Sequence, residues 1–229
     1  KRVAWGKALN AGQTCIAPDY ILVHEDVQEA FLKLLVREWK HLLTKDPQKA
    51  KHFVRIVSDK ALDRLISYLP NSQSPTANGH IYYGGTYDKA DRYLSPTILT
   101  DVSPEAPVMQ EEIFGPIFPV LTFKDIDEVI TFVTKREKPL ALYYFGTNGD
   151  YVLRHTSSGG ACVNDVIMHI VNHNVPFGGV GNSGMGTYHG KESFLAFTHR
   201  RATITTPTWV DMPFRYMPYK LFKWIKKMV

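Results

Sequence analysis

The sequence predicts an α/β fold with a largely parallel sheet. Apolar, β-branched runs alternate along the chain with amphipathic helical patterns, and parallel strands require such helical crossovers. Turn-rich, glycine-containing stretches lie between them, where sheets of this kind carry their active sites. The 229 residues are 44% hydrophobic, which is enough to bury one sizeable core. We therefore expect a single main α/β domain.

The first half of the chain predicts helices and one early strand. Residues 3–9 resemble the end of a helix without a start signal, which suggests a chain cut from something longer. Residues 20–23 form an apolar strand pattern, and Asp26 is the expected N-cap of the helix that follows. A second amphipathic helix is expected over residues 58–69, where leucine and isoleucine side chains share one face.

The middle of the chain predicts most of the sheet. Residues 81–85 and 93–99 are strand candidates, and Pro96 places the second one at a sheet edge or a bend. Residues 117–123 are strongly β-like. Asp125 is expected to cap the next helix, and residues 141–145 supply a further strand.

The C-terminal part predicts one more strand and a basic tail. Residues 202–206 alternate and are β-branched, so we expect a late strand able to pair across a subunit boundary. We assign residues 1–207 to the main domain and residues 208–229 to the tail. In the tail, apolar side chains at 221, 222, 225, 228 and 229 alternate with lysines. Such a basic amphipathic helix suits either a membrane surface or a protein partner.

Composition limits the function classes. The net charge of +5 arises largely in the last fifteen residues, and no zinc-finger or RNA-recognition spacing accompanies it, so we expect no nucleic-acid partner. The two cysteines form no disulfide framework, which favours a reducing compartment. No apolar run reaches the length of a bilayer span, and residues 1–5 do not resemble a signal peptide.

Cys15 is the residue around which the chain is organised. It lies on a short connection, Gly12-Gln13-Thr14-Cys15, between a helical pattern and an apolar strand. A thiol on such a connection can reach a cleft and act as a thiolate nucleophile. The structural alternative is a small buried side chain, because free cysteines are among the most buried residues.

Two later motifs favour the catalytic interpretation. Residues 111–116 (Glu-Glu-Ile-Phe-Gly-Pro) and the glycine-rich residues 176–186 follow the Cys15 motif in the order found in aldehyde dehydrogenases. The sequence resembles that superfamily from residue 1 to about 207, and residues 188–191 and 198–201 resemble its class 3, fatty-aldehyde branch. The resemblance implies the parallel-sheet catalytic domain of that fold, without most of the N-terminal nucleotide-binding domain.

The resemblance also implies roles for particular residues. Cys15 matches the nucleophile, which forms a thiohemiacetal and then a thioester with the aldehyde substrate. Glu112 and Phe114 match the pair that holds the nicotinamide ribose of NAD, with NADP as an alternative cofactor. Glu111, one residue away, is expected to be a solvated or capping carboxylate. Asn10, Phe177 and His169 are assigned to the substrate pocket.

Other interpretations of these residues carry less weight. Gly179-Val180-Gly181-Asn182-Ser183-Gly184 has dinucleotide-binding spacing, but no predicted strand leads into it, so a close-packed loop is expected. Cys162 lies in a strand pattern and is assigned to structure. A Cys–His hydrolase lacks its surrounding signature here, and no third ligand joins His169 and His173 in a metal site.

One expected element is absent from the sequence. The family's catalytic glutamate belongs to a Glu-Leu-Gly-Gly-Lys stretch, which does not occur in these 229 residues. Two hypotheses follow: the chain is the catalytic-domain part of an aldehyde dehydrogenase that oxidises fatty, medium-chain or aromatic aldehydes, or it is a truncated, non-catalytic module that dimerises or associates with a membrane. The resemblance implies a homodimer, located in the cytoplasm or on the cytoplasmic face of a membrane such as the endoplasmic reticulum.

Overall fold

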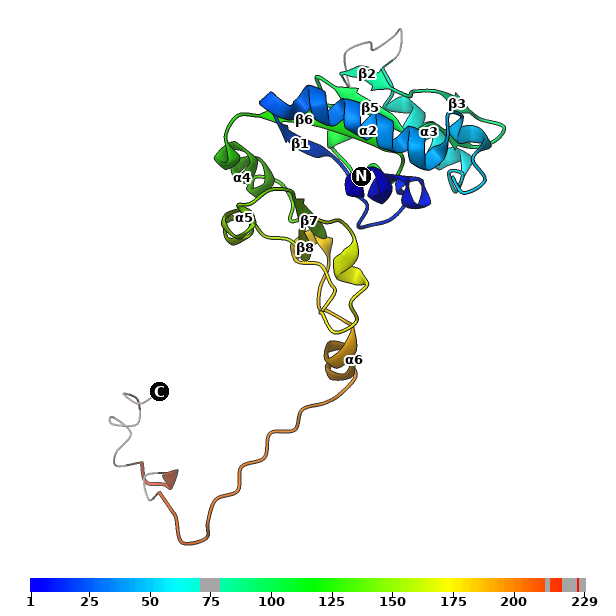
Figure 1. Ribbon diagram of the computed structural model, residues 1–229. Helices are drawn as coiled ribbons and strands as arrows, with labels where there is room; N and C mark the ends of the chain where they lie inside the picture. Colours follow the sequence, from blue (N-terminus) through cyan, green and yellow to red (C-terminus); the bar gives the residue numbers. More distant parts are fainter. Residues whose placement is uncertain (71–78, 213–214, 220–225, 227–229) are drawn as a thin grey trace. The chain divides into compact units, whose positions relative to one another are not determined.

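The computed structural model describes residues 1–70, 79–212, 215–219 and 226. Contacts divide the chain into two compact units, Lys1–Ala196 and Phe197–Val229. Helices and strands alternate through the first unit (Figure 1). The α-helices are α1 (Arg2–Ala8), α2 (Gln28–Leu43), α3 (Asp59–Ser67), α4 (Ile126–Thr134), α5 (Gly149–His155) and α6 (Gly190–Ala196). The strands are β1 (Ile21–His24), β2 (His80–Tyr83), β3 (Tyr87–Asp88), β4 (Tyr93–Leu94), β5 (Thr97–Thr100), β6 (Ile117–Phe123), β7 (Ala141–Tyr144) and β8 (Gly160–Val163).

The main sheet has the strand order β1-β6-β5-β2. The β1–β6 and β5–β6 pairs are parallel, and β2 joins the edge antiparallel to β5. A separate parallel pair is formed by β7 and β8, and a short antiparallel pair by β3 and β4. The expected α/β class with a parallel-dominated sheet is confirmed.

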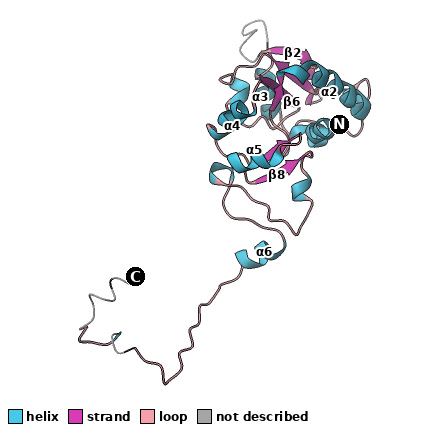
Figure 2. Cartoon of the chain, turned by 60° about the vertical axis from the view of Figure 1, so that its left-hand side comes forward, coloured by secondary structure: helices cyan, strands magenta, loops and turns pink. Residues whose placement is uncertain are grey.

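Helices cover both faces of the main sheet because side chains alternate along its strands. Phe118 and Val120 of β6 pack with α1 and α2, whereas Ile117 and Leu121 pack with α3 on the opposite face. Trp39 of α2 is 1% exposed, and its ring stacks on Phe118 with centroids 5.8 Å apart. Figure 2 shows these helical and extended segments by type.

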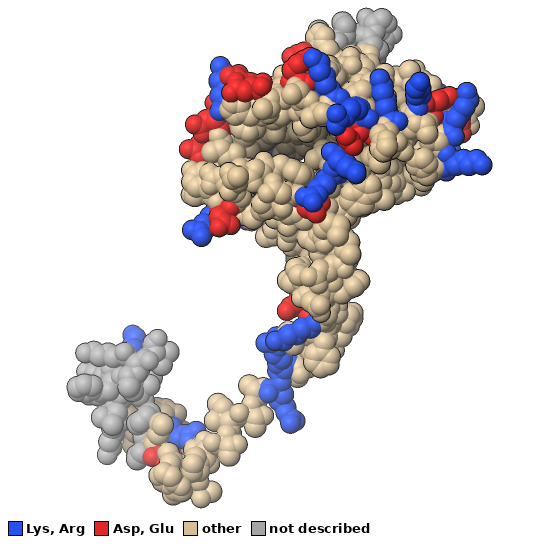
Figure 3. All heavy atoms as spheres, viewed as in Figure 1, with Lys and Arg blue, Asp and Glu red and all other residues tan. Residues whose placement is uncertain are grey.

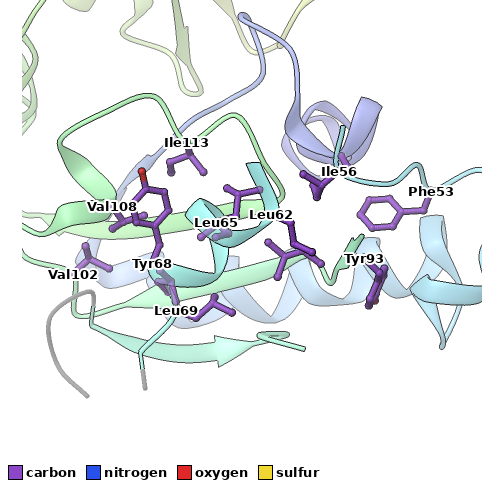
Figure 4. Packing of buried hydrophobic residues seen from close by; sticks show 14 of the residues in the cluster. Phe53, Ile56, Leu62, Leu65, Tyr68, Leu69, Tyr93, Val102, Val108 and Ile113 are labelled. Carbon is purple, nitrogen blue, oxygen red and sulfur yellow. The ribbon is translucent and has the colours of Figure 1, made fainter. Parts of the chain in front are cut away.

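The α3 side of the sheet carries the larger hydrophobic cluster (Figure 4). Leu62 and Leu65 point from α3 into it and are at most 1% exposed. Phe53 and Tyr93 meet edge to face at its border, 6.4 Å apart. Ile113 is fully buried in the same cluster, so the loop that carries the 111–116 motif is tied to the core.

Several predicted elements are confirmed by their local capping. The Ser58 side chain accepts a hydrogen bond from the backbone N–H of Ala61 and starts α3. The Asp125 side chain accepts one from Asp127 and starts α4. The prediction for Asp26 was wrong: the His24 ring accepts from the Asp26 N–H, a 3₁₀ turn (Glu25–Val27) intervenes, and α2 starts only at Gln28.

Two strand predictions depend on what lies beside each segment. Residues 93–99 divide at Pro96 into β4 and β5, so of the two alternatives, an edge or a bend, the bend is confirmed, and β5 lies inside the sheet between β6 and β2. The strand over residues 202–206 is expected to pair across a subunit boundary, so it stays a prediction; in this single chain the segment forms no strand, and Ile204 is 90% exposed. A strand requires a neighbour for its backbone groups, and no described strand pairs with this segment.

The second unit contributes little described regular structure. The predicted domain boundary at residue 207 falls within this unit and stays a prediction. The predicted amphipathic helix lies outside the described residues except for Lys226. Within the described part of the chain, no helix combines the length and apolar character needed to span a membrane.

Candidate active site

Cys15 and Glu112 line the same cavity, which has a volume of about 1580 Å³. The cavity lies within the first unit, and the space-filling view shows its opening as a dark hollow (Figure 3). Cys15 is exposed, in the turn between the 3₁₀ segment Leu9–Gly12 and β1. The thiol is therefore open to small molecules, and the buried-cysteine alternative does not describe it.

The two motifs meet through their glycines. Gly12 has a φ of +72°, and a Cβ atom on it would lie 2.3 Å from the carbonyl oxygen of Gly115. Asn10 and Ala11, just before it, also have positive φ values of 51° and 52°. This left-handed run turns the chain sharply out of α1, and glycine permits the closest approach. The Cys15 loop and the 111–116 loop are thus packed backbone to backbone.

Gln13 fixes the Cys15 loop to a neighbouring segment. Its amide nitrogen donates to the carbonyl of Arg55 at 3.1 Å, and its amide oxygen accepts from the N–H of Val57 at 2.9 Å. Asn10 donates through Nδ2 to the Gln13 carbonyl at 2.9 Å. Asn10 lies outside the cavity lining, so the contact seen here is a turn contact, and its assignment to the substrate pocket stays a prediction.

Tyr143 of β7 holds the other side of the same loop. Its hydroxyl donates to the carbonyl of Ile16, next to Cys15, at 2.7 Å. Burial raises the pKa of Tyr143 well above its ordinary value, so the hydroxyl stays protonated and remains a donor. The Ile16 side chain is 2% exposed and packs with Val166 and Phe177.

The loop that carries Glu112 is held by Arg64 and Asp19. Arg64 of α3 donates to the carbonyls of Glu112 and Ile113 at 3.1 and 2.6 Å. The Asp19 carboxylate accepts from the Ile113 N–H at 3.0 Å. Phe114 has a φ of 49° and a ring that is 38% exposed. Glu112 lines the cavity but Phe114 does not, so the assignment of this pair to the cofactor ribose stays a prediction.

A buried charge cluster lies behind Glu112. Lys7 is 1% exposed, and its ammonium group donates to the Asp19 carbonyl at 3.2 Å. Burial lowers the pKa of Lys7 to about 8, although Asp19 and Glu112 oppose this shift. Burial also raises the pKa values of Asp19 and Glu112, and the negative charge of Asp19 raises the pKa of Glu112 further. The cluster therefore couples the protonation of Glu112 to that of Lys7 and Asp19.

Glu111 faces a different environment from Glu112. Its carboxylate accepts from the hydroxyl of Tyr68 and lies 3.6 Å from the Arg64 guanidinium. The Tyr68 hydrogen bond lowers the pKa of Glu111, whereas burial raises that of Glu112. The two neighbouring carboxylates therefore lie in different surroundings, and the choice of Glu112 as the functional acid stays a prediction.

His169 and Phe177 lie together behind the Cys15 loop rather than in the cavity lining. The sulfur of Cys162 lies 3.4 Å from His169 Nδ1, and the rings of His169 and Phe177 are 5.7 Å apart. Phe177 is 8% exposed. Phe177 packs with Ile16, and the His169 ring lies 5.9 Å from that of Tyr143, but the structure does not test their assignment to a substrate pocket. Cys162 lies in β8, as expected for a structural residue, although it is only partly buried.

The glycine-rich stretch is a close-packed loop, as expected. A Cβ atom on Gly179 would lie 2.1 Å from the Ser183 carbonyl oxygen, and one on Gly178 would lie 2.1 Å from that of Gly186. The segment leading into Gly181–Ser183 contains no strand, and the turn itself is a single 3₁₀ turn. This geometry does not match the strand-to-helix turn of a dinucleotide-binding fingerprint.

The sequence interpretation missed Lys7, Asp19, Arg64 and Tyr143. Lys7 and Arg64 occur in helical patterns where charged residues usually face solvent. Asp19 offered the clearest signal, because a lone carboxylate follows Pro18 directly before an apolar strand. Tyr143 lies within a strand pattern and carries no motif of its own.

Several known proteins are similar to this chain in sequence. A model of the aldehyde dehydrogenase family matches residues 1–203. The chain is 45% identical over 210 residues to the dimeric NADP-preferring aldehyde dehydrogenase of Bos taurus, covering 90% of this chain and 85% of that one. It is 48% identical over 204 residues to aldehyde dehydrogenase family 3 member A2 of Mus musculus, covering 88% of this chain and 41% of that one.

A solved structure matches the fold as well as the sequence. The substrate-bound Staphylococcus aureus AldH superposes with a TM-score of 0.85 at 44% identity, covering 99% of this chain and 49% of that chain. This chain likewise spans 44% of the mouse dimeric NADP-preferring enzyme. It therefore corresponds to about half the length of the mouse and Staphylococcus aureus enzymes. The chain belongs to the aldehyde dehydrogenase family.

Proposed function

We propose that this chain supplies the nucleophile-bearing part of an NAD(P)-dependent aldehyde dehydrogenase, with Cys15 as the catalytic residue. The observation that carries the proposal is the shared cavity of Cys15 and Glu112, held together by the Gly12–Gly115 contact. The names of the relatives support the reaction class, since they are aldehyde dehydrogenases that include NADP-preferring enzymes.

The chemistry of Cys15 follows from the properties of a thiolate. Its sulfur adds to the carbonyl carbon of the aldehyde and forms a thiohemiacetal. A bound NAD(P)⁺ would supply the acceptor for the hydride that the aldehyde carbon must lose. Water then attacks the Cys15 thioester, which releases the carboxylic acid and restores the thiolate. Sulfur suits both ends of this cycle because it adds readily and later leaves from an acyl group.

Glu112 and Phe114 are proposed to hold the cofactor's nicotinamide ribose. The Glu112 carboxylate would accept hydrogen bonds from the ribose hydroxyls, and the exposed Phe114 ring would pack nearby. Such residues act by positioning the reacting groups rather than by bonding to them. Arg64 and Asp19 contribute indirectly, because they hold the backbone on either side of Glu112.

The proposed substrates are apolar aldehydes. The lining of the cavity includes apolar side chains that follow Cys15 in the sequence, among them Ala17, Pro18 and Ile21. One relative, from Staphylococcus aureus, is named 4,4'-diaponeurosporen-aldehyde dehydrogenase. The general base that hydrolyses the thioester is expected outside these 229 residues, which lack the Glu-Leu-Gly-Gly-Lys stretch.

The test joins this chain to the part of the Staphylococcus aureus enzyme that the match leaves uncovered, and follows NADH formation with decanal. We expect turnover by the chimera, a loss of at least ~10³-fold in kcat for Cys15→Ser, and little change for Cys162→Ser. Glu112→Gln should raise the KM for NAD⁺ about tenfold with a smaller effect on kcat. Full activity in Cys15→Ser would refute the assignment. Complete inactivity of every chimera would favour the non-catalytic alternative.

Two further parts of the proposal concern partners. A homodimer is proposed because the similar bovine and murine enzymes are named dimeric, and sedimentation of the 229-residue chain measures it. Binding of the basic tail to a membrane surface is proposed from its sequence pattern alone. Deleting residues 220–229 should reduce binding to anionic vesicles, and the binding of the intact chain should weaken with salt. Unchanged, salt-independent binding would contradict the membrane proposal.

A further inference from the structure

Tyr143 connects a strand from late in the chain to the peptide group that follows Cys15. It belongs to β7, and its hydroxyl donates to the carbonyl oxygen of Ile16 at 2.7 Å. The tyrosine is partly buried, and its ring lies 5.9 Å from that of His169. The bond therefore ends on the residue directly after the proposed nucleophile.

Cys15 and Ile16 are the two central residues of a turn. The Ala17 N–H donates to the carbonyl oxygen of Thr14 at 2.9 Å, which closes this turn. The Ile16 carbonyl and the Ala17 N–H belong to one peptide group, and each of them has its own hydrogen-bond partner. A rotation of this peptide group would break both bonds at once, so Tyr143 and Thr14 together hold it in one orientation.

The surroundings of the Tyr143 hydroxyl determine where its proton points. Burial raises the pKa of Tyr143, while a hydrogen bond from the backbone N–H of Ile167 opposes this rise. Because Ile167 supplies a donor, the hydroxyl proton is left for the Ile16 carbonyl. The thiols of Cys162 and Cys15 raise the pKa of Tyr143 further when they are ionised. Tyr143 therefore remains a neutral donor while Cys15 is a thiolate.

The Ile16 side chain is anchored separately from its carbonyl group. It is 2% exposed and packs with Val166 and Phe177. Cys15, one position earlier, is exposed. The sulfur is thus on the accessible residue of a turn whose next residue is fixed through both its side chain and its backbone.

We propose that Tyr143 is a positioning residue for the Cys15 nucleophile. Its hydroxyl keeps the peptide group between Ile16 and Ala17 in one orientation, which limits the directions in which the Cys15 sulfur can point. Attack on an aldehyde requires the sulfur to lie about 3–3.5 Å from the carbonyl carbon with the right alignment, so a looser turn reacts more slowly. The inference rests on the proposed function, because it assigns Tyr143 a role in the attack by Cys15.

Hydrogen exchange followed by NMR tests whether Tyr143 holds the turn. Tyr143→Phe removes the hydroxyl and keeps the ring. Tyr151→Phe is the matched control, because the Tyr151 hydroxyl donates to the Asp127 carboxylate at 2.8 Å and lies outside the cavity lining. In the 229-residue chain alone, the Ala17 amide should exchange at least about tenfold faster in Tyr143→Phe than in the wild type or Tyr151→Phe. Equal exchange in the three proteins would overturn the inference.

The chimera described above tests the consequence for catalysis. Tyr143→Phe should lower kcat with decanal about tenfold and change the KM for NAD⁺ less than about twofold, whereas Tyr151→Phe should leave both nearly unchanged. Alkylation of Cys15 by iodoacetamide should stay within about twofold of the wild-type rate, because this small reagent needs only an exposed thiol. An unchanged kcat would overturn the inference. A lower kcat together with faster alkylation of Cys162 would indicate a loosened β7–β8 pair and would also overturn it.

The inference and the proposed function fail in different ways. An inactive wild-type chimera would refute the proposed function, and the Ala17 exchange would still decide whether Tyr143 holds the turn. Turnover that requires Cys15 but is equally fast without the Tyr143 hydroxyl would overturn this inference alone.

Discussion

Gly12 approaches Gly115 so closely that a Cβ atom on Gly12 would lie 2.3 Å from the Gly115 carbonyl oxygen. The contact joins the loop of the proposed nucleophile to the loop of the proposed ribose-binding acid. The two loops are held by different elements, since Tyr143 holds the first and Arg64 the second. The contact between Gly12 and Gly115 therefore fixes how close the two loops lie to each other.

Gly12→Ala should destabilise the protein more than a change at a similar but open position. Gly186 has nearly the same φ, +71°, with nothing within 4 Å of a Cβ atom, whereas Gly12 would meet backbone. We expect the free energy of unfolding, measured in urea, to fall by about 1 kcal/mol in Gly186→Ala and by about 3 kcal/mol or more in Gly12→Ala. Equal losses of unfolding free energy in the two variants would mean that the close contact between Gly12 and Gly115 does not constrain the two loops.

Lys7 should make stability depend on pH. The folded chain releases the Lys7 proton at a pKa of about 8, compared with 10.5 for an ordinary lysine. The unfolded state therefore binds more protons between these values, and the free energy of unfolding rises with pH there. Relative to Lys7→Met, the wild type should gain about 2 kcal/mol from pH 8 to pH 10. A constant difference across this range would contradict the lowered pKa.

The two thiols should differ in their reaction with iodoacetamide. Cys15 is exposed, whereas Cys162 is partly buried, and burial raises its pKa. We expect Cys15 to react at least about tenfold faster at pH 7.5, with the fast phase lost in Cys15→Ser and retained in Cys162→Ser. Peptide mapping identifies the modified site. The opposite pattern would place the reactive thiol at Cys162.

Arg64 should stabilise the protein through its bonds to the 111–116 loop, which a surface arginine does not make. Arg64→Lys loses the planar pair of donors that bind the carbonyls of Glu112 and Ile113. We expect a loss of about 2 kcal/mol in the free energy of unfolding. Arg37→Lys is the control, because Arg37 is 70% exposed and pairs only with Glu38 among its described contacts, and it should change stability by less than about 0.5 kcal/mol.

Helices whose capping residues lie within a few positions of their hydrogen-bond partners could be predicted from the sequence. Ser58 and Asp125 cap helices with bonds to residues two or three positions away, so a short stretch of sequence contains both partners. Asp26 is the counterexample, because the neighbouring His24 ring took the capping role. The strand over residues 202–206 has a suitable pattern, but pattern alone does not provide the neighbouring strand that it needs.

The candidate site could be predicted only in part, because some of its contacts join residues that are far apart in the sequence. The motifs around Cys15 and Glu112 are visible in the sequence, and both residues line one cavity. Lys7 is not recognisable, because it is buried by Phe118 and Asp19 from other elements.

The hydrogen bond from Tyr143 to Ile16 has a consequence for synthesis of the protein. The two residues are 127 positions apart in sequence. The loop that bears Cys15 leaves the ribosome first, and it waits on the order of 10 s for its tyrosine partner at ordinary elongation rates. During translation the sulfur is therefore present well before the scaffold that orients it is complete.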